Sequence, residues 1–267
     1  MDMNEVVQNK IDYLLLAKQL IPAVRKAGNV IIDIYQRGAV AQAKPDGSPV
    51  SDADMAAEAI LLPAIKAAAP FIPIVSEENS ASHNVVDAEQ FFLVDPLDGT
   101  KEFLKSDGSG AFTVNIGLIE NKIPVMGIVY APALDRLFFS GLNAGAFEMT
   151  NERSFKIGVR SLPFDGSVAV ASASHMDSKT DQWLNARGIV QIVSIGSSLK
   201  FCLIAAGEAD VYPRYGPTME WDTAAGDAIL RAAGGRVEGE DGKTFYYGKP
   251  QYLNTAFFAF GSLIYAS

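Results

Sequence analysis

Two carboxylates at the end of an apolar run have the type and spacing that most clearly suit chemistry in this chain. Asp95 and Asp98 follow the run 91–94 (Phe-Phe-Leu-Val) and precede Gly99. Pro96 has a fixed φ and restricts Asp95 to an extended conformation, so the turn is stiff and can direct both carboxylates to one point. Gly99 allows the backbone to approach a ligand closely, and free N–H groups at such a turn can hold a phosphate. A surface turn with two solvated carboxylates is the alternative that this pair alone leaves open.

Three further segments place acidic residues where an element begins or ends. Glu77 and Glu78 end a second apolar run, and Asp222 precedes an alanine-rich run, where it could also be a helix N-cap. Ser51 and Asp54 fit a variant of the capping box, a structural role that is compatible with a catalytic role for Asp54. Each segment has an ordinary structural explanation when it is considered alone.

The small number of histidines and cysteines restricts the type of metal site that the chain can form. The chain has two histidines, His83 and His175, and one cysteine, Cys202; both histidines lie in polar, loop-like surroundings. This disfavours a histidine-based zinc site and a Ser-His-Asp triad. Oxygen-only ligands suit Mg²⁺, Mn²⁺ or Ca²⁺, and converging carboxylates repel one another unless cations bridge them. Two such ions, about 3.5–4 Å apart, activate water and stabilise a leaving oxygen in phosphoryl transfer.

Composition indicates a folded globular protein with a local, rather than general, affinity for anions. The chain has 267 residues, of which 49% are hydrophobic and 20% charged, and its formal net charge is −9. This charge argues against a nucleic acid polymer as partner, whereas metal ions or a few cations can still create a site for a small phosphate compound. No run reaches the ~18 apolar residues of a membrane span, and the start of the sequence lacks a secretory signal. With a single cysteine, we expect a cytoplasmic protein, for which a loose peripheral association with membranes stays open.

The pattern of elements predicts two tightly associated parts. Helices are expected at about 12–38, where Pro22 kinks the run or begins a new helix, and at about 51–70; strands are expected at 71–75, 91–94, 112–119, 125–130 and 136–139. The second part alternates, with strands at 168–171 and 189–195 and helices at 179–187, 199–206 and 223–233. We therefore expect an α+β part at 1–160 that carries most of the acidic residues and an α/β part at 161–267 that carries Asp222. The oligomeric state stays open.

The four acidic segments, taken in order, resemble those of the inositol monophosphatase superfamily, a group of lithium-sensitive, Mg²⁺-dependent phosphatases. Its two signatures correspond here to residues 95–100 (Asp-Pro-Leu-Asp-Gly-Thr) and 221–226 (Trp-Asp-Thr-Ala-Ala-Gly). Four ordered motifs over nearly the whole chain make coincidence a poor explanation. The resemblance implies a layered αβαβα sandwich with metal ions at the junction of the two parts.

The same resemblance implies roles for individual residues. The expected ligands of two or three Mg²⁺ ions are Glu77, Asp95, the carbonyl of Leu97, Asp98 and Asp222. Asp95 would bridge two ions, and the residues expected to act in catalysis are Glu77, Thr100 and Asp54. Thr100 and Asp54 would orient the attacking water, and the amides of Gly99 and Thr100 would hold the phosphate that is removed.

Within the superfamily, two further segments are similar to those of bacterial bisphosphate nucleotidases. They are 196–202 (Gly-Ser-Ser-Leu-Lys-Phe-Cys) and 212–218 (Tyr-Pro-Arg-Tyr-Gly-Pro-Thr). The expected substrate contacts beyond those already given are Gly196, Ser197, Lys200 and Arg214. An acidic protein needs local cations to bind a second phosphate that is not hydrolysed, as in 3′-phosphoadenosine 5′-phosphate, and Lys200 and Arg214 suit that purpose. Asp227 departs from several relatives, which carry histidine there.

Three functions are compatible with these residues. The first is hydrolysis of 3′-phosphoadenosine 5′-phosphate to adenosine 5′-phosphate and phosphate. The second is an inositol or sugar phosphatase on the same scaffold. The third is a nucleotide sensor that binds metal and ligand without catalysis.

Overall fold

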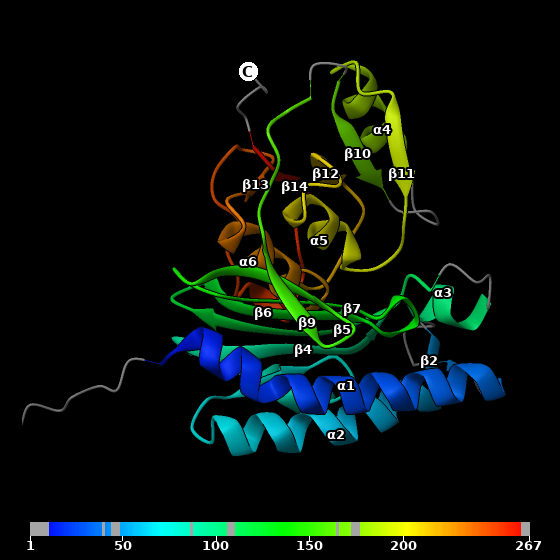
Figure 1. Ribbon diagram of the computed structural model, residues 1–267, viewed down its shortest axis with the longest axis vertical. Helices are drawn as coiled ribbons and strands as arrows, with labels where there is room; N and C mark the ends of the chain where they lie inside the picture. The colour runs from blue at the N-terminus through cyan, green and yellow to red at the C-terminus, as the bar shows by residue number, and fades with distance from the viewer. Residues whose placement is uncertain are drawn as a thin grey trace, which may run out of the picture.

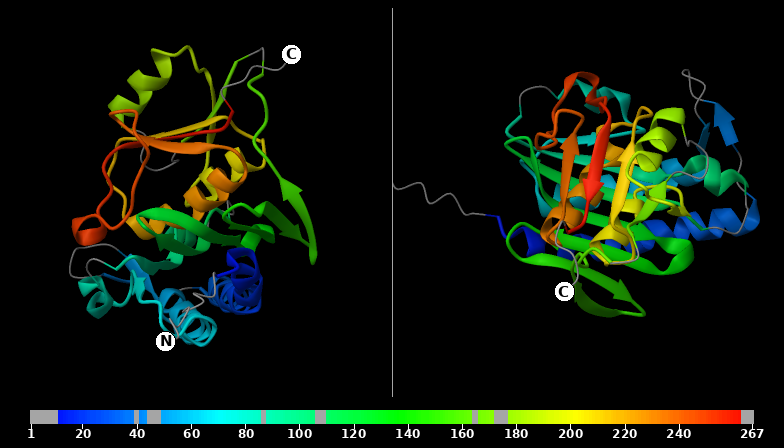
Figure 2. Two further views of the ribbon diagram at one scale, coloured as in Figure 1. Left: turned by 90° about the vertical axis from the view of Figure 1, so that its left-hand side faces the viewer. Right: turned by 90° about the horizontal axis from the view of Figure 1, so that it is seen from above.

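The structure is a computed structural model that describes residues 11–38, 41–43, 49–85, 88–105, 110–163, 166–171 and 177–262. His175 lies outside the described residues. The molecule is built of five layers, alternately helices and sheets, which are seen edge-on in the left view of Figure 2 (Figure 1, Figure 2). The sequence-based prediction of an αβαβα sandwich is confirmed. Within the described residues, no helix is long and apolar enough to cross a membrane.

Two long helices form the first layer. They are α1 (Tyr13–Arg37) and α2 (Asp52–Ala68), which pack against each other beneath the larger sheet (Figure 1). Asp12 caps α1 by accepting from the Leu15 N–H at 2.9 Å, and the helix continues through Pro22, so no new helix begins there. Ser51 caps α2, as its sequence predicts.

The larger sheet has seven strands in the order β3-β4-β5-β6-β7-β8-β9. Only β3 and β4 run parallel; the other neighbours are antiparallel. The strands are β3 (Ile74–Ser76), β4 (Gln90–Asp98), β5 (Thr113–Glu120), β6 (Ile123–Ala131), β7 (Arg136–Gly141), β8 (Gly145–Thr150) and β9 (Arg153–Ile157). The hairpin β8–β9 was not predicted, because its outer strand is mostly exposed and lacks an apolar run.

The smaller sheet lies on the far side of two helices. Its five strands have the order β11-β10-β12-β14-β13 and span Gln191–Ser194, Val168–Ala171, Val211–Arg214, Phe257–Phe260 and Arg236–Gly239. Helices α5 (Leu199–Ala205) and α6 (Ala224–Ala232) fill the space between the sheets, and α4 (Ser178–Asn185) covers the outer face (Figure 2). The remaining short elements are β1 (Ala41–Ala43), β2 (Pro49–Ser51), α3 (Thr100–Lys105), η1 (Ser80–Asn84), η2 (Pro132–Leu134), η3 (Glu220–Asp222) and η4 (Pro250–Tyr252).

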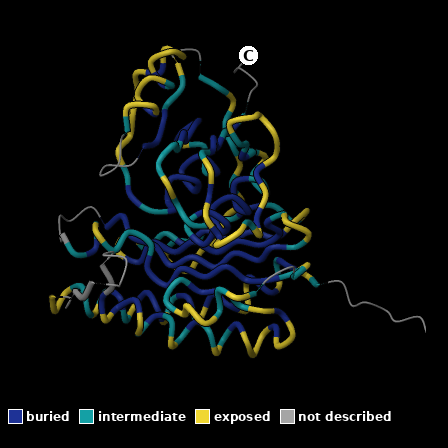
Figure 3. The backbone as a smooth tube through the Cα atoms, turned by 180° about the vertical axis from the view of Figure 1, so that it is seen from behind, coloured by how far each residue is buried: buried dark blue, intermediate teal, exposed yellow. Residues whose placement is uncertain are grey.

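Strand β4 is buried on both faces, which explains its unbroken apolar sequence. Phe92 and Val94 belong to the core between the larger sheet and α1/α2, whereas Phe91 and Leu93 belong to the core on the α5/α6 side. Figure 3 shows the strands of this sheet as the most continuously buried part of the backbone. Because helices cover both faces, alternation of apolar and polar residues is lost. Each fully buried large side chain here contributes about 1.5–3 kcal/mol, so the strand is a firm support for the residues at its end.

Candidate active site

The end of β4 carries Asp95 into the interior. The strand does not end at Val94, as the sequence suggested, but continues through Pro96 to Asp98. Its pairing with β5 shifts register between Asp95 and Asp98, which accommodates a proline in a central strand because such residues are tolerated at irregularities of the ladder. Asp95 is 1% exposed, and its Oδ1 accepts from the Leu97 N–H at 3.0 Å.

Three carboxylates converge at this point from separate parts of the chain. Carboxylate oxygens of Glu77, Asp95 and Asp222 all lie within 4.8 Å of one another. Glu77 follows β3, which is parallel to β4, and Asp222 ends η3. Burial, together with the neighbouring acids, raises the pKa of Asp95 and of Asp222 well above the usual range. Such a cluster favours protons or, in their place, a bound cation.

Asp98 is held by residues of the second half of the chain. Its Oδ2 accepts from the Ser198 N–H at 2.6 Å and from the Ser198 hydroxyl at 2.9 Å. The Ser198 hydroxyl also lies 2.6 Å from the Asp222 carbonyl and accepts from Asn115 Nδ2 at 2.8 Å. Burial raises the pKa of Asp98, and the charge of Lys200 and the Ser198 donors offset part of this rise. Asp98 is therefore adjacent to the three converging carboxylates, although it is not one of them.

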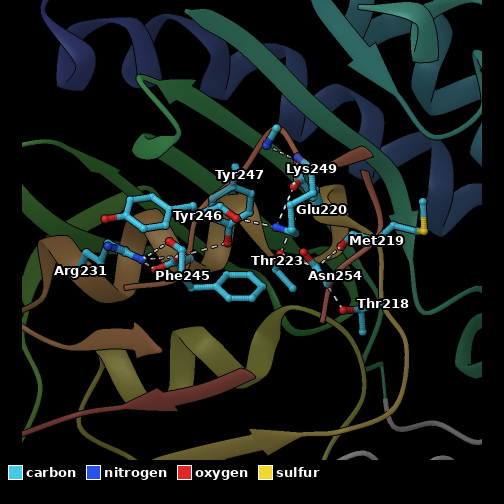
Figure 4. Close-up of polar contacts among 12 residues, drawn as sticks. Thr218, Met219, Glu220, Thr223, Arg231, Phe245, Tyr246, Tyr247, Lys249 and Asn254 are labelled. Carbon is cyan, nitrogen blue, oxygen red and sulfur yellow. Dashed lines mark hydrogen bonds and ion pairs between the residues drawn. The ribbon is translucent and has the colours of Figure 1, made fainter. Parts of the chain in front are cut away.

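The turn that carries Asp222 is clamped on both sides by Asn254. The Asn254 amide lies within hydrogen-bond distance of the Thr218 hydroxyl, the Met219 carbonyl and the Thr223 hydroxyl, at 3.1, 2.7 and 3.1 Å (Figure 4). Within the turn, the Met219 N–H donates to Asp222 Oδ2 at 2.8 Å. Residues before and after Asp222 are thus tied to one side chain, which limits how far this carboxylate can move.

A buried ionic network supports the same turn from behind (Figure 4). Glu220 accepts from the backbone N–H groups of Gly248 and Lys249 at 2.8 and 2.9 Å and pairs with Lys249 Nζ at 2.7 Å. Asp227, which is fully buried, pairs with Arg231 at 2.6 Å and accepts from the Tyr247 hydroxyl at 3.0 Å. Asp227 therefore belongs to the packing of α6 rather than to the lining of the cleft.

Asp54 and Thr100 lie beside the acidic cluster. Both the N–H and the hydroxyl of Ser51 donate to Asp54 Oδ2, at 2.8 and 2.7 Å, which confirms the predicted capping box. The other oxygen, Oδ1, is 3.5 Å from the Thr100 hydroxyl, and that hydroxyl is also 3.2 Å from the Leu97 carbonyl. Burial raises the pKa of Asp54, and the nearby charge of Glu78 adds to the effect, while the Ser51 bonds lower it.

A cleft of about 390 Å³ opens beside these residues. Its lining includes Glu77, Asp98, Gly99, Thr100, Gly196, Ser197, Lys200, Arg214 and Asp222. The structure thus brings together acidic residues of the first half and the predicted cations of the second. Asp95, Asp54 and Leu97 are each 1% exposed and are not among the lining residues.

The two cations that the sequence predicted for the cleft, Lys200 and Arg214, are oriented by backbone carbonyls. Lys200 Nζ donates to the carbonyls of Ile195 and Ser197 at 3.3 and 2.7 Å, and Arg214 donates to those of Gly216 and Pro217 at 3.1 and 3.2 Å. Lys200 is 4% exposed; burial lowers its pKa to about 8, although Asp98 acts in the opposite direction.

Two backbone positions in the site have left-handed φ angles. Gly99 has φ +90°, and a Cβ there would also lie 3.0 Å from the Ala111 carbonyl oxygen, so the glycine is required. Ser197 has φ +55°, a conformation that costs a non-glycine residue on the order of 1 kcal/mol. Its carbonyl receives the Lys200 ammonium group, which gives a physical reason for retaining this conformation.

The backbone of helix α6 packs directly against the backbone of the larger sheet. A Cβ at Gly127 of β6 would lie 2.2 Å from the Ala225 carbonyl oxygen and 3.0 Å from Ala228 Cβ. A side chain at Gly127 would therefore require a shift of the α6 backbone, and this helix begins at Ala224, two residues after Asp222.

Several residues that support the site were not predicted to do so. Ser198 lies inside the segment 196–202, but the pattern pointed only to its neighbours, and Asn115 and Asn254 stand in no recognisable pattern. His83 was placed in a loop, whereas it lies in η1 and its ring stacks on Trp221. A serine immediately before a predicted helix was the one available signal, since such residues often donate or accept at helix starts.

Comparison with known proteins identifies the class. The profile of the inositol monophosphatase family matches residues 12–263, and the chain therefore belongs to this family of metal-dependent phosphatases. An inositol monophosphatase from Anabaena has a similar structure, with a TM-score of 0.73 and 26% identity over 94% of this chain and 92% of that one.

Other similar proteins are named as one particular enzyme of this family. The 3'(2'),5'-bisphosphate nucleotidase CysQ of Salmonella typhimurium is 42% identical over 246 residues, which are 91% of this chain and 98% of the relative. The same enzyme of Escherichia coli K12 is 40% identical over 90% of this chain and 97% of its own. The crystal structure of CysQ from Bacteroides thetaiotaomicron has a TM-score of 0.78 and 37% identity, and covers 94% of this chain and 99% of that one.

Proposed function

We propose that this protein is a 3′(2′),5′-bisphosphate nucleotidase that hydrolyses 3′-phosphoadenosine 5′-phosphate to adenosine 5′-phosphate and phosphate. The observation that carries the proposal is one cleft lined both by acidic residues next to a carboxylate cluster and by the buried Lys200 with Arg214. A substrate with two phosphates uses both features, whereas a monophosphate uses only the first. The relatives that share at least 40% identity over most of the chain carry this activity in their names. We place the reaction in sulfur assimilation or nucleotide recycling.

The acidic cluster fits the proposed Mg²⁺ ions. Three carboxylates lie within 4.8 Å of one another and offer the hard oxygen donors that Mg²⁺ prefers, and burial and neighbouring acids raise the pKa of two of them, Asp95 and Asp222. The residues that would hold the ions are Glu77, Asp95, the Leu97 carbonyl, Asp98 and Asp222. When bound, the ions would activate a water molecule and neutralise charge on the phosphate and leaving oxygen.

Thr100 and Asp54 would orient the attacking water. Asp54 Oδ2 is engaged by Ser51, which leaves Oδ1 directed to the Thr100 hydroxyl at 3.5 Å. If the Thr100 proton goes to Asp54, the hydroxyl oxygen is available to accept from water, and the water is directed toward the phosphorus. The N–H groups of Gly99 and Thr100 would hold the phosphate that is removed, and Glu77 would act from the metal side.

Lys200 and Arg214 would bind the phosphate that is retained. Two N–H donors of Lys200 are engaged by carbonyls, so the third is the one that would contact the anion. Gly196 and Ser197, at the floor of this part of the cleft, would contact the nucleotide through their backbone. The single cysteine, buried Cys202, fits a reducing compartment, and our proposal therefore includes a cytoplasmic location.

A substrate panel tests the proposal. We expect phosphate release from 3′-phosphoadenosine 5′-phosphate to exceed that from inositol 1-phosphate and adenosine 3′-phosphate in kcat/KM by at least about tenfold, equivalent to one charge-assisted contact. EDTA should abolish it and Mg²⁺ restore it. Faster release from inositol 1-phosphate would replace the nucleotidase with an inositol phosphatase, and the absence of release from every compound would indicate a binding protein.

A further inference from the structure

His83 lies at the junction of two chain segments that each lead into an acidic residue of the site. Its Nε2 is 2.8 Å from the carbonyl oxygen of Ser76, the residue before Glu77. Its ring stacks on Trp221, the residue before Asp222, with centroids 4.9 Å apart and planes 24° from parallel. One imidazole therefore contacts the neighbours of two carboxylates that are 145 positions apart in sequence, the difference between 222 and 77.

The peptide unit that joins Ser76 to Glu77 is fixed from both sides. Its carbonyl accepts from His83, since a carbonyl oxygen only accepts and Nε2 must carry the proton. Its N–H donates to the carbonyl of Val94, the residue before Asp95, at 3.1 Å. The Ser76–Glu77 peptide unit and the His83 ring thus connect the chain segments that carry Glu77, Asp95 and Asp222.

The surroundings of His83 restrict the position of the ring itself. The Ser76 N–H donates to the hydroxyl of Ser82 at 3.0 Å, which ties η1 to the end of β3. The ring centroid of Tyr252 lies 6.3 Å from that of His83 and 6.1 Å from that of Trp221, and Trp221 is 5% exposed. Because the ring is held between these groups, we expect a change in His83 to alter the separation of Glu77 and Asp222.

We infer that His83 is a positioning residue that sets the distance between the Glu77 and Asp222 carboxylates and thereby the affinity of the cluster for a divalent cation. The inference rests on the proposed function, because it takes these carboxylates as metal ligands. Groups that orient metal ligands from behind typically change metal affinity about 10- to 100-fold when they are removed. His83 does not line the cleft, so its effect reaches the carboxylates through the two segments that it contacts.

The test is calorimetric titration of the full-length protein with Mg²⁺ and with Mn²⁺, which measures binding without turnover. We expect His83→Ala to raise the dissociation constant about tenfold. His83→Phe keeps a ring on Trp221 but loses the N–H donor, and we expect a rise of about threefold, since one of two contacts is retained. If His83→Ala does not fold, His83→Phe still decides the question.

The chain offers a matched control for simple loss of packing. Trp183 and Phe258 form a stack of nearly the same geometry, with centroids 5.0 Å apart and planes 23° from parallel, on the outer side of the smaller sheet. We expect Phe258→Leu to lower the melting temperature as His83→Ala does, while its metal dissociation constant stays within about twofold of wild type, within measurement scatter for independent sites.

The outcomes separate this inference from the proposed function. If wild-type protein binds metal and releases phosphate in a metal-dependent manner, but His83→Ala binds metal as wild type does, only the inference is wrong. An equal loss of affinity in Phe258→Leu would also overturn it, because packing alone would then explain the result. If wild-type protein neither binds metal nor requires it, both the proposed function and the inference fail.

Discussion

The two sides of the cleft carry opposite charges, and backbone groups of opposite polarity hold them in place. On the acidic side, formed by Glu77, Asp95, Asp98 and Asp222, carboxylates accept from backbone N–H groups such as those of Leu97, Ser198 and Met219. On the basic side, formed by Lys200 and Arg214, the cations donate to backbone carbonyls. Fixed backbone dipoles orient both sets of charges before any ligand arrives, which removes the need for rearrangement during the reaction.

The two sides differ in how completely their charge is balanced. On the acidic side, burial and then the negative charge of neighbouring acids raise the pKa values of Asp95 and Asp222. On the basic side, burial lowers the pKa of Lys200 to about 8, so burial disfavours the charged form of this lysine. A suitable ligand therefore brings cations to the first side and an anion to the second. Substitutions on the two sides should accordingly differ in which substrates and which ions they affect.

The largest effect is expected from Asp95→Asn on the acidic side. Loss of this carboxylate, which we propose as a metal ligand, should lower turnover on the order of a thousandfold, comparable to removing a group that stabilises transition-state charge. The pKa of Asp95 is raised in the folded state, so the protonated form is favoured there and stability is lost as pH rises above the usual range of a carboxyl group. At pH 7 without metal, the variant should therefore melt about 2–4 °C above wild type, equivalent to about 1 kcal/mol.

Phosphate release and thermal unfolding with and without Mg²⁺ measure these two effects. Added Mg²⁺ should raise the melting temperature of wild type more than that of Asp95→Asn. Near-normal turnover by the folded variant would contradict the assignment of Asp95 as a ligand.

Arg214→Ala tests the basic side. If Arg214 binds the retained phosphate, kcat/KM for 3′-phosphoadenosine 5′-phosphate should fall about ten- to a hundredfold, since a hydrogen bond to a charged group contributes about 1.5–3 kcal/mol. Adenosine 3′-phosphate, which lacks the second phosphate, should be hydrolysed at nearly the wild-type rate. The ratio of the two kcat/KM values is the measurement, and an equal loss on both substrates would instead show that Arg214 supports the fold or the acidic side.

Ser198→Ala tests the connection between the two sides. The variant loses the hydroxyl that lies between Asp98 and the Asp222 carbonyl, but it keeps the N–H donor to Asp98. We expect a fall of about tenfold in kcat/KM, because one hydrogen bond to a charged group is removed. Steady-state kinetics on bisphosphate and monophosphate nucleotides should show the same loss, in contrast to Arg214→Ala. A loss confined to the bisphosphate would assign Ser198 to the basic side.

The smallest expected effect is a pH dependence that belongs to Lys200. A lysine is charged below its pKa, which is lowered here to about 8. The ratio of kcat/KM for bisphosphate to monophosphate should therefore be constant up to about pH 7 and fall severalfold by about pH 9, since kcat/KM reports the free enzyme. Lys200→Met should give a lower ratio without this decline. A decline of the same size in the variant would exclude Lys200 as its source.

Local signals in the sequence predicted much of the fold, and they singled out the three acids, Glu77, Asp95 and Asp222, that the structure brings together. The expected helix at 199–206 is found at Leu199–Ala205, and the expected strand at 168–171 matches Val168–Ala171. Capping by Ser51 and Asp54 was also predictable, because both partners lie within one helical turn. The predicted parts 1–160 and 161–267 stay a prediction, although β9 ends at Ile157 and β10 begins at Val168.

The supporting contacts could not be predicted, because they join distant segments. Ser198 reaches Asp98 across 100 positions, and His83 reaches Trp221 through a stack that no periodicity encodes. The continuation of β4 through Pro96 was missed for a related reason, since a proline normally ends a central strand and only its pairing with β5 reveals the shift in register.

The close approach at Gly127 has a consequence for how this site can change over many generations of mutation. Any side chain there must push α6 outward, because the obstacle is the Ala225 carbonyl rather than a movable side-chain tip. Asp222 lies two residues before Ala224, the first residue of this helix, so we expect it to move with the helix, away from Asp95 in β4 and from Glu77 just after β3. A larger residue at position 127, which touches no ligand, would thus widen the space for ions. Because Ca²⁺ is larger than Mg²⁺, retention of glycine at this position would help the site to select Mg²⁺.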